Sequence, residues 1–442
     1  MAAGGTFTSQ NKVRPGAYIN FIGTPKSLSS VGERGVVAAP LSLSWGGQVI
    51  ELTTQDLVTG ASLEKAGVLF TDDEALNLRL LLQSCRRAII YRLNAATATK
   101  ATKTVAGLKV TAVHGGTFGN KIAFTAEVKM GQIMVKTFAN GQLVDTQRVA
   151  AVSELIANDF VEFEVATGEL ESISTKTALT GGADGQEVTD ISAALAALES
   201  YQFNILAITQ TDSTTKEQAV QWIESQRSDK GSKVQVVVSE YNGDSEAVIS
   251  TWQGYTLEDG TEISKAQTVL AVASLEAGAT LTQSMTGAVI SGGVAVNDEP
   301  TTNDEIIDAL NAGKLILSRR GDGAIIIEKD QNTLHTFTPT KGYIFSKNRP
   351  LRVLDQIGND VRDLFNKSYL GKVSNDESGR NIFKNDLVSY FKTLEAMGAI
   401  QNFSVDDVQV LPGNDSDSVV VNLYVQPVDS MEKLYMTVNV NG

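Results

Sequence analysis

The stretch NILAI at residues 204–208, with TKEQAVQWIESQ at 215–226 and VQVVV at 234–238, decides the fold class. The first and third runs are short and apolar, as buried strands are, and the segment between them has the mixed polarity of a helix. A strand, a helix and a second strand in this order predict a unit in which the two strands lie parallel in one sheet. We therefore expect an α/β protein with a largely parallel sheet that is covered on both faces.

The same alternation continues on both sides of this stretch. Upstream, residues 35–39 and 87–91 are predicted strands, and a capping box at Thr71–Glu74 predicts a helix that runs to about Cys85. Between residues 95 and 180 the composition changes to Thr, Val, Gly and Lys, with alternating runs separated by turns, which predicts a β-rich inserted domain. Further predicted elements are helices at 190–199, 264–277, 303–312, 351–366 and 380–397, and strands at 122–128, 133–138, 142–149, 315–318 and 418–425.

The predicted architecture is a layered α/β core with a β-rich inserted domain, a C-terminal α+β domain and strand-bearing arms at both ends. The expected boundaries are an N-terminal arm at 1–26, core segments at 27–95 and 183–348, the outer inserted domain at 96–182, an inner C-terminal domain at 349–431 and a C-terminal arm at 432–442.

Charge and composition exclude several classes of protein. The formal net charge of −14 over 442 residues opposes binding to polyanions, and no basic patch offsets it. Cys85 is the single cysteine, so we expect a buried, reduced thiol and assembly in a reducing cytoplasm. No signal-peptide pattern is present, and no run of roughly 18 apolar residues occurs. We expect neither export by a signal peptide nor insertion into a membrane.

Motifs for catalysis are missing. The two histidines, His114 and His335, lie far apart in the sequence without carboxylate or cysteine clusters, which argues against a metal site. No Gly-x-Ser-x-Gly or Gly-x-Gly-x-x-Gly pattern occurs, and residues 309–314 lack two positions of a phosphate loop. We expect no enzyme activity, catalytic residue, metal or cofactor. A ligand in the crevice at the carboxyl ends of the strands stays open as an alternative.

Each terminus carries a short β-prone run. One is Ala17, Tyr18, Ile19, Asn20 and Phe21, and the other is Leu434, Tyr435, Met436, Thr437, Val438, Asn439 and Val440. A strand gains stability only when its backbone joins a sheet, so each run either completes the chain's own sheet or pairs with a neighbouring subunit.

Several segments resemble the contractile tail sheath family, particularly the sheaths of Gram-positive phages and phage-like particles. They are GGTF at 4–7, NKVRPGAYINF at 11–21, GNKI at 119–122, LTGGADG at 179–185, ASLEAGATLTQS at 273–284 and RPLRVLD at 349–355. The resemblance spans almost the whole chain. It implies that both terminal runs add strands to adjacent subunits, that the inserted domain faces outward and that the C-terminal domain lies against the tail tube.

The resemblance also implies the partners and the place of the protein. Expected partners are other copies in stacked hexameric rings, the tail tube protein, and baseplate and tail terminator proteins, without direct contact to nucleic acid. The expected location is the virion tail or a phage-like particle, built in the cytoplasm of the bacterial host. A genome-free, phage-derived bacteriocin or injection particle is the alternative. Candidate tube-facing residues are Arg349, Arg352, Arg362, Lys367, Arg380, Lys384 and Lys392.

Overall fold

The computed structural model describes residues 3–5, 16–18 and 31–440. The chain is divided into two compact units. The large unit is Glu33–Asn359 with Pro427–Gly442, and the small unit is Met1–Gly32 with Asp360–Gln426.

A six-stranded sheet forms the centre of the large unit, in the order β15-β14-β13-β3-β5-β4. Every neighbouring pair is parallel except β4 with β5, which confirms the predicted, largely parallel sheet. The strands are β3 (Val36–Leu41), β4 (Val49–Thr53), β5 (Arg87–Arg92), β13 (Ile205–Ile208), β14 (Gln235–Ser239) and β15 (Val248–Thr251).

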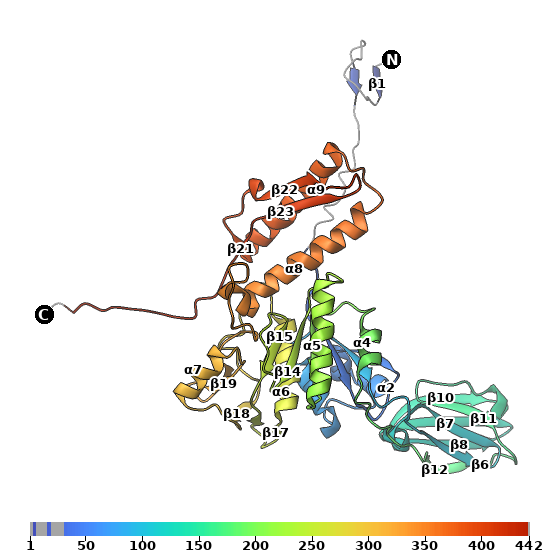
Figure 1. The fold of residues 1–442 in the computed structure, drawn as a ribbon. Helices are drawn as coiled ribbons and strands as arrows, with labels where there is room; N and C mark the ends of the chain where they lie inside the picture. The colour runs from blue at the N-terminus through green and yellow to red at the C-terminus, as the bar shows by residue number, and fades with distance from the viewer. Residues whose placement is uncertain (1–2, 6–15, 19–30, 441–442) are drawn as a thin grey trace. The chain divides into compact units, whose positions relative to one another are not determined.

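Helices cover both faces of this sheet (Figure 1). Side chains alternate along β3, so that Val37 and Ala39 join one apolar core while Val36 and Ala38 join the other. The first core includes residues of α1 (Thr54–Thr59), α2 (Ser62–Ala66), α3 (Leu76–Leu82) and α6 (Lys265–Gly278). The second core includes residues of α4 (Ser192–Leu198) and α5 (Ser213–Ser228).

The predicted capping box at Thr71–Glu74 is wrong. A 3-10 turn at Asp73–Ala75 precedes α3. Asp72 comes directly before this turn, and its side chain makes no capping hydrogen bond to the turn. The Asp72 carboxylate instead accepts the backbone N–H of Leu69 at 2.8 Å, and Arg79 donates to the Asp72 carbonyl. The acid therefore stabilises the turn before the helix, and α3 begins later and ends earlier than predicted.

A smaller antiparallel region follows the main sheet. It contains β16 (Tyr255–Leu257), β17 (Glu262–Ile263), β18 (Gly293–Val296), α7 (Asn303–Asn311), β19 (Leu317–Arg319) and β20 (Ile325–Ile327). The predicted strand at 315–318 corresponds to β19, which pairs with β20 outside the six-stranded sheet. The predicted helix at 303–312 is confirmed as α7, which begins with a capping box between Thr302 and Glu305.

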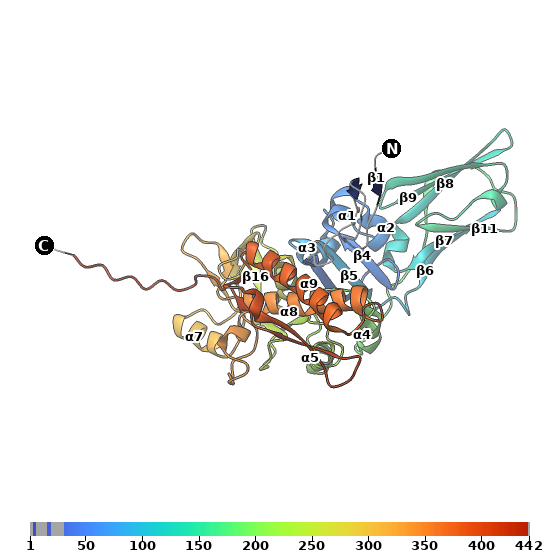
Figure 2. The same cartoon turned by 90° about the horizontal axis from the view of Figure 1, so that it is seen from above.

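The insertion after β5 consists of two antiparallel sheets that enclose a separate apolar core (Figure 2). Its strands are β6 (Lys100–Val105), β7 (Leu108–Gly115), β8 (Ile122–Lys129), β9 (Gln132–Ala139), β10 (Gln142–Val149), β11 (Val161–Val165) and β12 (Ile173–Ala178). The three strands predicted from alternation are confirmed as β8, β9 and β10.

The small unit is built on two helices and a hairpin. Helix α8 (Asn348–Leu364) crosses from one unit to the other, and a π-helical turn at Phe365–Tyr369 follows it. Then come α9 (Glu377–Ala396), β21 (Ile400–Gln401), the hairpin of β22 (Val408–Pro412) and β23 (Val419–Leu423), and β24 (Gln426–Pro427). Near the N-terminus, β1 (Ala3–Gly5) pairs in parallel with β2 (Gly16–Tyr18).

Arg92 ties the insertion to the sheet. Its guanidinium is buried and donates to the carbonyl oxygens of Leu43, Gly46 and Gly115 at 2.8–2.9 Å. The next residue, Gly116, has φ 138°, and a Cβ there would lie 1.9 Å from the Ser44 carbonyl oxygen. The corner therefore needs both a long cationic donor and a glycine.

We expect Arg92→Ala to lower the free energy of unfolding by about 3 kcal/mol, because several buried carbonyl oxygens lose their donor. Urea unfolding measures this change. Arg320→Ala is the control, since Arg320 pairs with Asp322 in an exposed turn. Equal effects of the two substitutions would contradict a structural role for Arg92.

Candidate functional site

The sheet crevice, the first place to seek a ligand, is bridged by the chain itself. Glu187 accepts hydrogen bonds from Ser42, which follows β3, and from Gln210, which follows β13, at 2.9 and 3.1 Å. These two strands flank the point where the strand order reverses, where α/β sheets commonly bind ligands. A ligand in this crevice would therefore have to displace the side chain of Glu187, which already bridges it.

The other chemical candidates are structural. His114 is half-buried at the end of β7, with its ring edge-on to Trp45 at 5.0 Å, and His335 lies on an exposed loop. Burial raises the pKa of the Cys85 thiol to about 11, so this buried thiol stays protonated. Among the described residues, no group of three or more His, Cys, Asp or Glu side chains could hold a metal ion. No described helix is long and apolar enough to cross a membrane.

The predicted N-terminal strand is described only in part. Ala17 and Tyr18 lie in β2, whose described partner is β1 of the same chain. Ile19, Asn20 and Phe21 lie outside the described residues. Pairing of this run with a neighbouring subunit stays a prediction.

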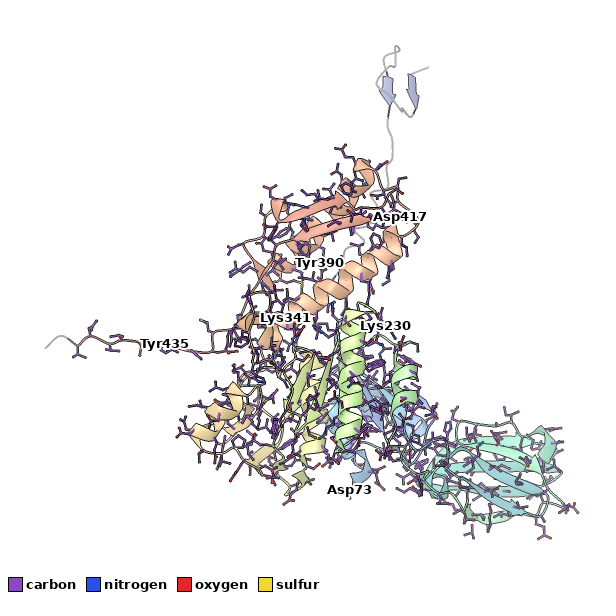
Figure 3. All side chains as sticks on the ribbon, in the orientation of Figure 1. Asp73, Lys230, Lys341, Tyr390, Asp417 and Tyr435 are labelled. Carbon is purple, nitrogen blue, oxygen red and sulfur yellow. The ribbon has the colours of Figure 1, made fainter. Side chains whose placement is uncertain are left out.

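The C-terminal run does not form the predicted strand in the single chain. Leu434–Val440 lies in no sheet, and the side chains of Leu434, Tyr435, Met436, Val438 and Val440 are 68–88% exposed. Figure 3 shows Tyr435 on this segment, which extends clear of the rest of the large unit. The strand is absent because no neighbouring backbone is available to complete its hydrogen bonds. The alternative that this run completes the chain's own sheet is wrong for this structure.

The root of this segment, by contrast, is firmly bound to the large unit. The buried ammonium of Lys347 lies 2.6 Å from Asp429 and 2.9 Å from Glu432. Thr286 donates a further hydrogen bond to Glu432 at 2.9 Å. Burial lowers the pKa of Lys347, but the hydrogen bonds to the two carboxylates outweigh burial and raise the pKa overall. We call the contacts of Lys347 and Thr286 with Asp429 and Glu432 the C-terminal anchor.

A second ionic cluster lies next to the anchor. Arg352 on α8 is 2.5 Å from Glu276 on α6 and 3.6 Å from Asp330, and all three residues are buried. Arg352 also donates to the carbonyl oxygen of Gln283 at 2.6 Å. Its proposed contact with a tail tube is therefore wrong for this structure, because the whole side chain is used inside the large unit.

The other candidate tube-facing residues remain at the surface to different degrees. Arg349 is half-buried, and its Nε finds no hydrogen-bond partner among the described residues. Arg362 and exposed Lys367 both approach Asp363, at 3.3 and 3.4 Å. Half-buried Arg380 donates to Asn375. Lys384 is half-buried, and Lys392 is exposed.

The small unit offers an open strand edge. Hairpin β22–β23 is a two-stranded sheet, and β22 is the strand in contact with α9. Within the described residues, no third strand lies beside β23. Such an edge presents unpaired N–H and C=O groups that can accept an added strand. Sequence patterns did not single out this edge, because the alternation that predicts a strand does not indicate its neighbours.

Comparisons with known proteins give one consistent result. The phage tail sheath protein central domain matches residues 184–333, and the phage tail sheath C-terminal domain matches residues 340–441. Protein XkdK of the phage-like element PBSX of Bacillus subtilis is 34% identical over 99% of this chain and 100% of its own length.

Two solved structures extend the likeness to the fold. The sheath tail protein of Desulfitobacterium hafniense is 36% identical, with a TM-score of 0.81 over 95% of this chain and 99% of that one. The helical sheath of the anti-feeding prophage, solved in its contracted state, is 11% identical, with a TM-score of 0.57 over 97% of this chain and 98% of that one. The second likeness is one of fold alone.

We expect Lys347→Met to release the C-terminal anchor, because Asp429 and Glu432 then repel each other without their cation. Deuterium uptake of residues 427–433 should rise in hydrogen-exchange mass spectrometry, while uptake of the six-stranded sheet stays unchanged. Lys341→Met is the matched control, since Lys341 is exposed and pairs with Glu246, which is not part of the C-terminal anchor. Unchanged uptake at 427–433 would show that Lys347 does not hold the segment.

Proposed function

Because the chain belongs to the phage tail sheath family, we propose that its copies polymerise around a tail tube and contract to drive that tube through a bacterial envelope. The role is structural. Contraction is supported by the fold that this chain shares with the anti-feeding prophage sheath, which was solved in a contracted state.

One observation carries the proposal: an extended C-terminal segment that is anchored at its root and unpaired beyond it. Apolar side chains at Leu434, Met436 and Val438 alternate with Tyr435 and Thr437, as in a strand with two different faces. In water, this segment exposes both apolar area and unpaired backbone groups. Addition of the segment to the sheet of a second copy buries the apolar area and pairs the backbone groups.

We place the receiving site at the free edge of β23 in a second copy. Residues Val420 and Tyr424 are exposed at or beside this edge, so little has to move before a strand is added. The N-terminal run Ala17–Phe21 is the second proposed connecting strand. Two strands that link each subunit to its neighbours keep a polymer connected while its stacked hexameric rings rearrange.

The tube is the proposed partner of the small unit and of the start of α8, which belongs to the large unit. The candidates that remain are Arg349, Arg362, Lys367, Arg380, Lys384 and Lys392. Exposed or half-buried cations form weak, salt-screened pairs, which can break together as the rings move outward. Baseplate and tail terminator proteins are the proposed partners at the two ends, within a particle tail built in the host cytoplasm.

The energy for contraction is proposed to be stored during assembly. Residues 309–314, the nearest approach to a phosphate loop, form the end of α7, where Gly313 has φ 72° and packs on the Thr333 backbone. A kinetically trapped extended sheath can supply this energy without a bound nucleotide. It does so when it relaxes to a contracted state of lower free energy.

A genome-free particle is the second candidate setting. The relative from Bacillus subtilis is a protein of a phage-like element, which favours this setting as much as that of an infectious phage. The sheath role is the same in both.

We expect deletion of 434–442 to abolish assembly into tubes without lowering the melting temperature of the monomer, because the deleted side chains that are described are exposed and bury little area. Electron microscopy across a concentration series and thermal unfolding measure the two effects. The matched control is Thr437→Ser with Asn439→Gln, which keeps the length and the apolar face. Tubes formed by the deletion variant would refute strand exchange through this segment.

We also expect Lys367→Glu and Lys392→Glu together to weaken retention of the tail tube protein, because reversal of two exposed charges replaces attraction with repulsion. The measurement is the fraction of tube protein that cosediments with sheath as salt is raised. Lys129→Glu in the inserted domain is the control, since Lys129 is exposed on a domain proposed to face outward. Retention that depends on neither charge nor salt would rule out these contacts.

A further inference from the structure

Two buried carboxyl groups share one cation beside the C-terminal anchor. Glu276 and Asp330 are each 1% exposed, and Arg352 is the cation within ion-pair distance of both. If both acids were ionised, the cluster would bury a net negative charge. Burial of an uncompensated charge is strongly unfavourable, whereas one added proton makes the cluster neutral.

One oxygen of Asp330 lacks a donor among the described residues, which indicates a place for that proton. The Asp330 Oδ2 atom accepts the backbone N–H of Met285 at 2.9 Å. Its Oδ1 atom is buried without a partner among the N–H and hydroxyl donors of the described residues. Glu276 and Asp330 lie within hydrogen-bonding reach of each other, and two carboxyl groups can bond only through a proton. A protonated Glu276 supplies the donor that Asp330 lacks.

The electrostatic surroundings agree with this assignment. Burial raises the pKa of Glu276, the charge of Asp330 raises it further, and Arg352 lowers it only in part. Two other charged groups lie close to Arg352 in sequence, and each is already paired: Lys347 with Asp429 and Glu432, and Asp355 on α8 with Arg227. Lys347 and Arg227 both stay charged through neutral pH.

Asp330 is also joined to the anchor by a short path. Its backbone N–H donates to the Thr286 hydroxyl at 2.9 Å, and that hydroxyl donates to Glu432 at 2.9 Å. The Asp330 carboxylate holds the adjacent Met285, and the Asp330 carbonyl accepts the N–H of Asn348, next to Lys347. A shift of Asp330 therefore moves both residues that bind Glu432.

We propose that Glu276 and Asp330 hold a single shared proton at neutral pH, and that loss of this proton loosens the C-terminal anchor. A carboxyl group whose pKa is raised by folding stabilises the fold fully below its ordinary pKa. That stabilisation is lost as the pH rises through the raised value. The shared proton thus stabilises the C-terminal anchor at lower pH, and its loss weakens the anchor at higher pH. This holds whether or not the segment is joined to a second copy.

Infrared difference spectroscopy of the full chain tests the first half of the proposal. A carbonyl band of a protonated carboxyl group is expected at about pH 6 and is lost by about pH 9. Glu276→Gln and Asp330→Asn should both remove it, the second because Glu276 then pairs alone with Arg352 and ionises. Glu262→Gln, at an exposed position of β17, should retain it. No such band in the unaltered chain at about pH 6 overturns the proposal, even if a variant fails to fold.

Hydrogen exchange tests the second half. Deuterium uptake of residues 427–433, corrected for the intrinsic rate, should increase between about pH 6 and about pH 9 in the unaltered chain and in Glu262→Gln. In Glu276→Gln the amide donates permanently to Asp330, so uptake should not change with pH. An equal increase in Glu276→Gln, or none in the unaltered chain, overturns the link between the proton and the anchor.

Discussion

The need to neutralise buried charge fixes the start of α8, and much else in the protein depends on that position. Three groups of ionic contacts converge there: Arg352 with Glu276 and Asp330, Asp355 with Arg227 at 2.6 and 2.8 Å, and Lys347 with Asp429 and Glu432. Buried charges tolerate few arrangements, because a displaced partner leaves an uncompensated ion in an apolar environment. The helix start, α5, α6 and the C-terminal root are thereby held together.

These ionic contacts explain how the C-terminal segment, which has no sheet partner, can have a fixed origin on the large unit. Residues 433–440 have exposed apolar side chains and no sheet partner, yet the origin of this segment on the large unit is fixed by Lys347 and Thr286. A fixed origin limits where the segment can reach and lowers the entropy lost when it joins another chain. The proposed function needs this combination, since the proposed connections would have to persist while the joined subunits move.

Contacts at the carboxyl ends of the strands of the α/β core are used inside the chain. Glu187 bridges the crevice where related sheets bind ligands, and Arg92 fastens the insertion to the loop after β3. Both contacts come from segments beside the insertion. The polar groups at the carboxyl ends of the strands thus hold domains in place.

The sequence by itself determined the features that rest on local patterns. Apolar runs predicted β13 and β14, alternation predicted β8 to β10, and the helix predicted at 303–312 is α7, because each depends on residues close in the chain. The family was also recognised from short segments, and the comparisons confirmed it.

Only the tertiary structure decided which charges and strands have partners. Arg352 looked like a surface cation on an amphipathic helix, but Glu276, 76 residues away in sequence, binds it in the core. Asp72 looked like part of a helix cap, but its carboxylate turns back to Leu69. The run Leu434–Val440 has the alternation of a strand and forms none alone. A pattern encodes what a segment can do, whereas pairing depends on groups that folding, or a second copy, brings beside it.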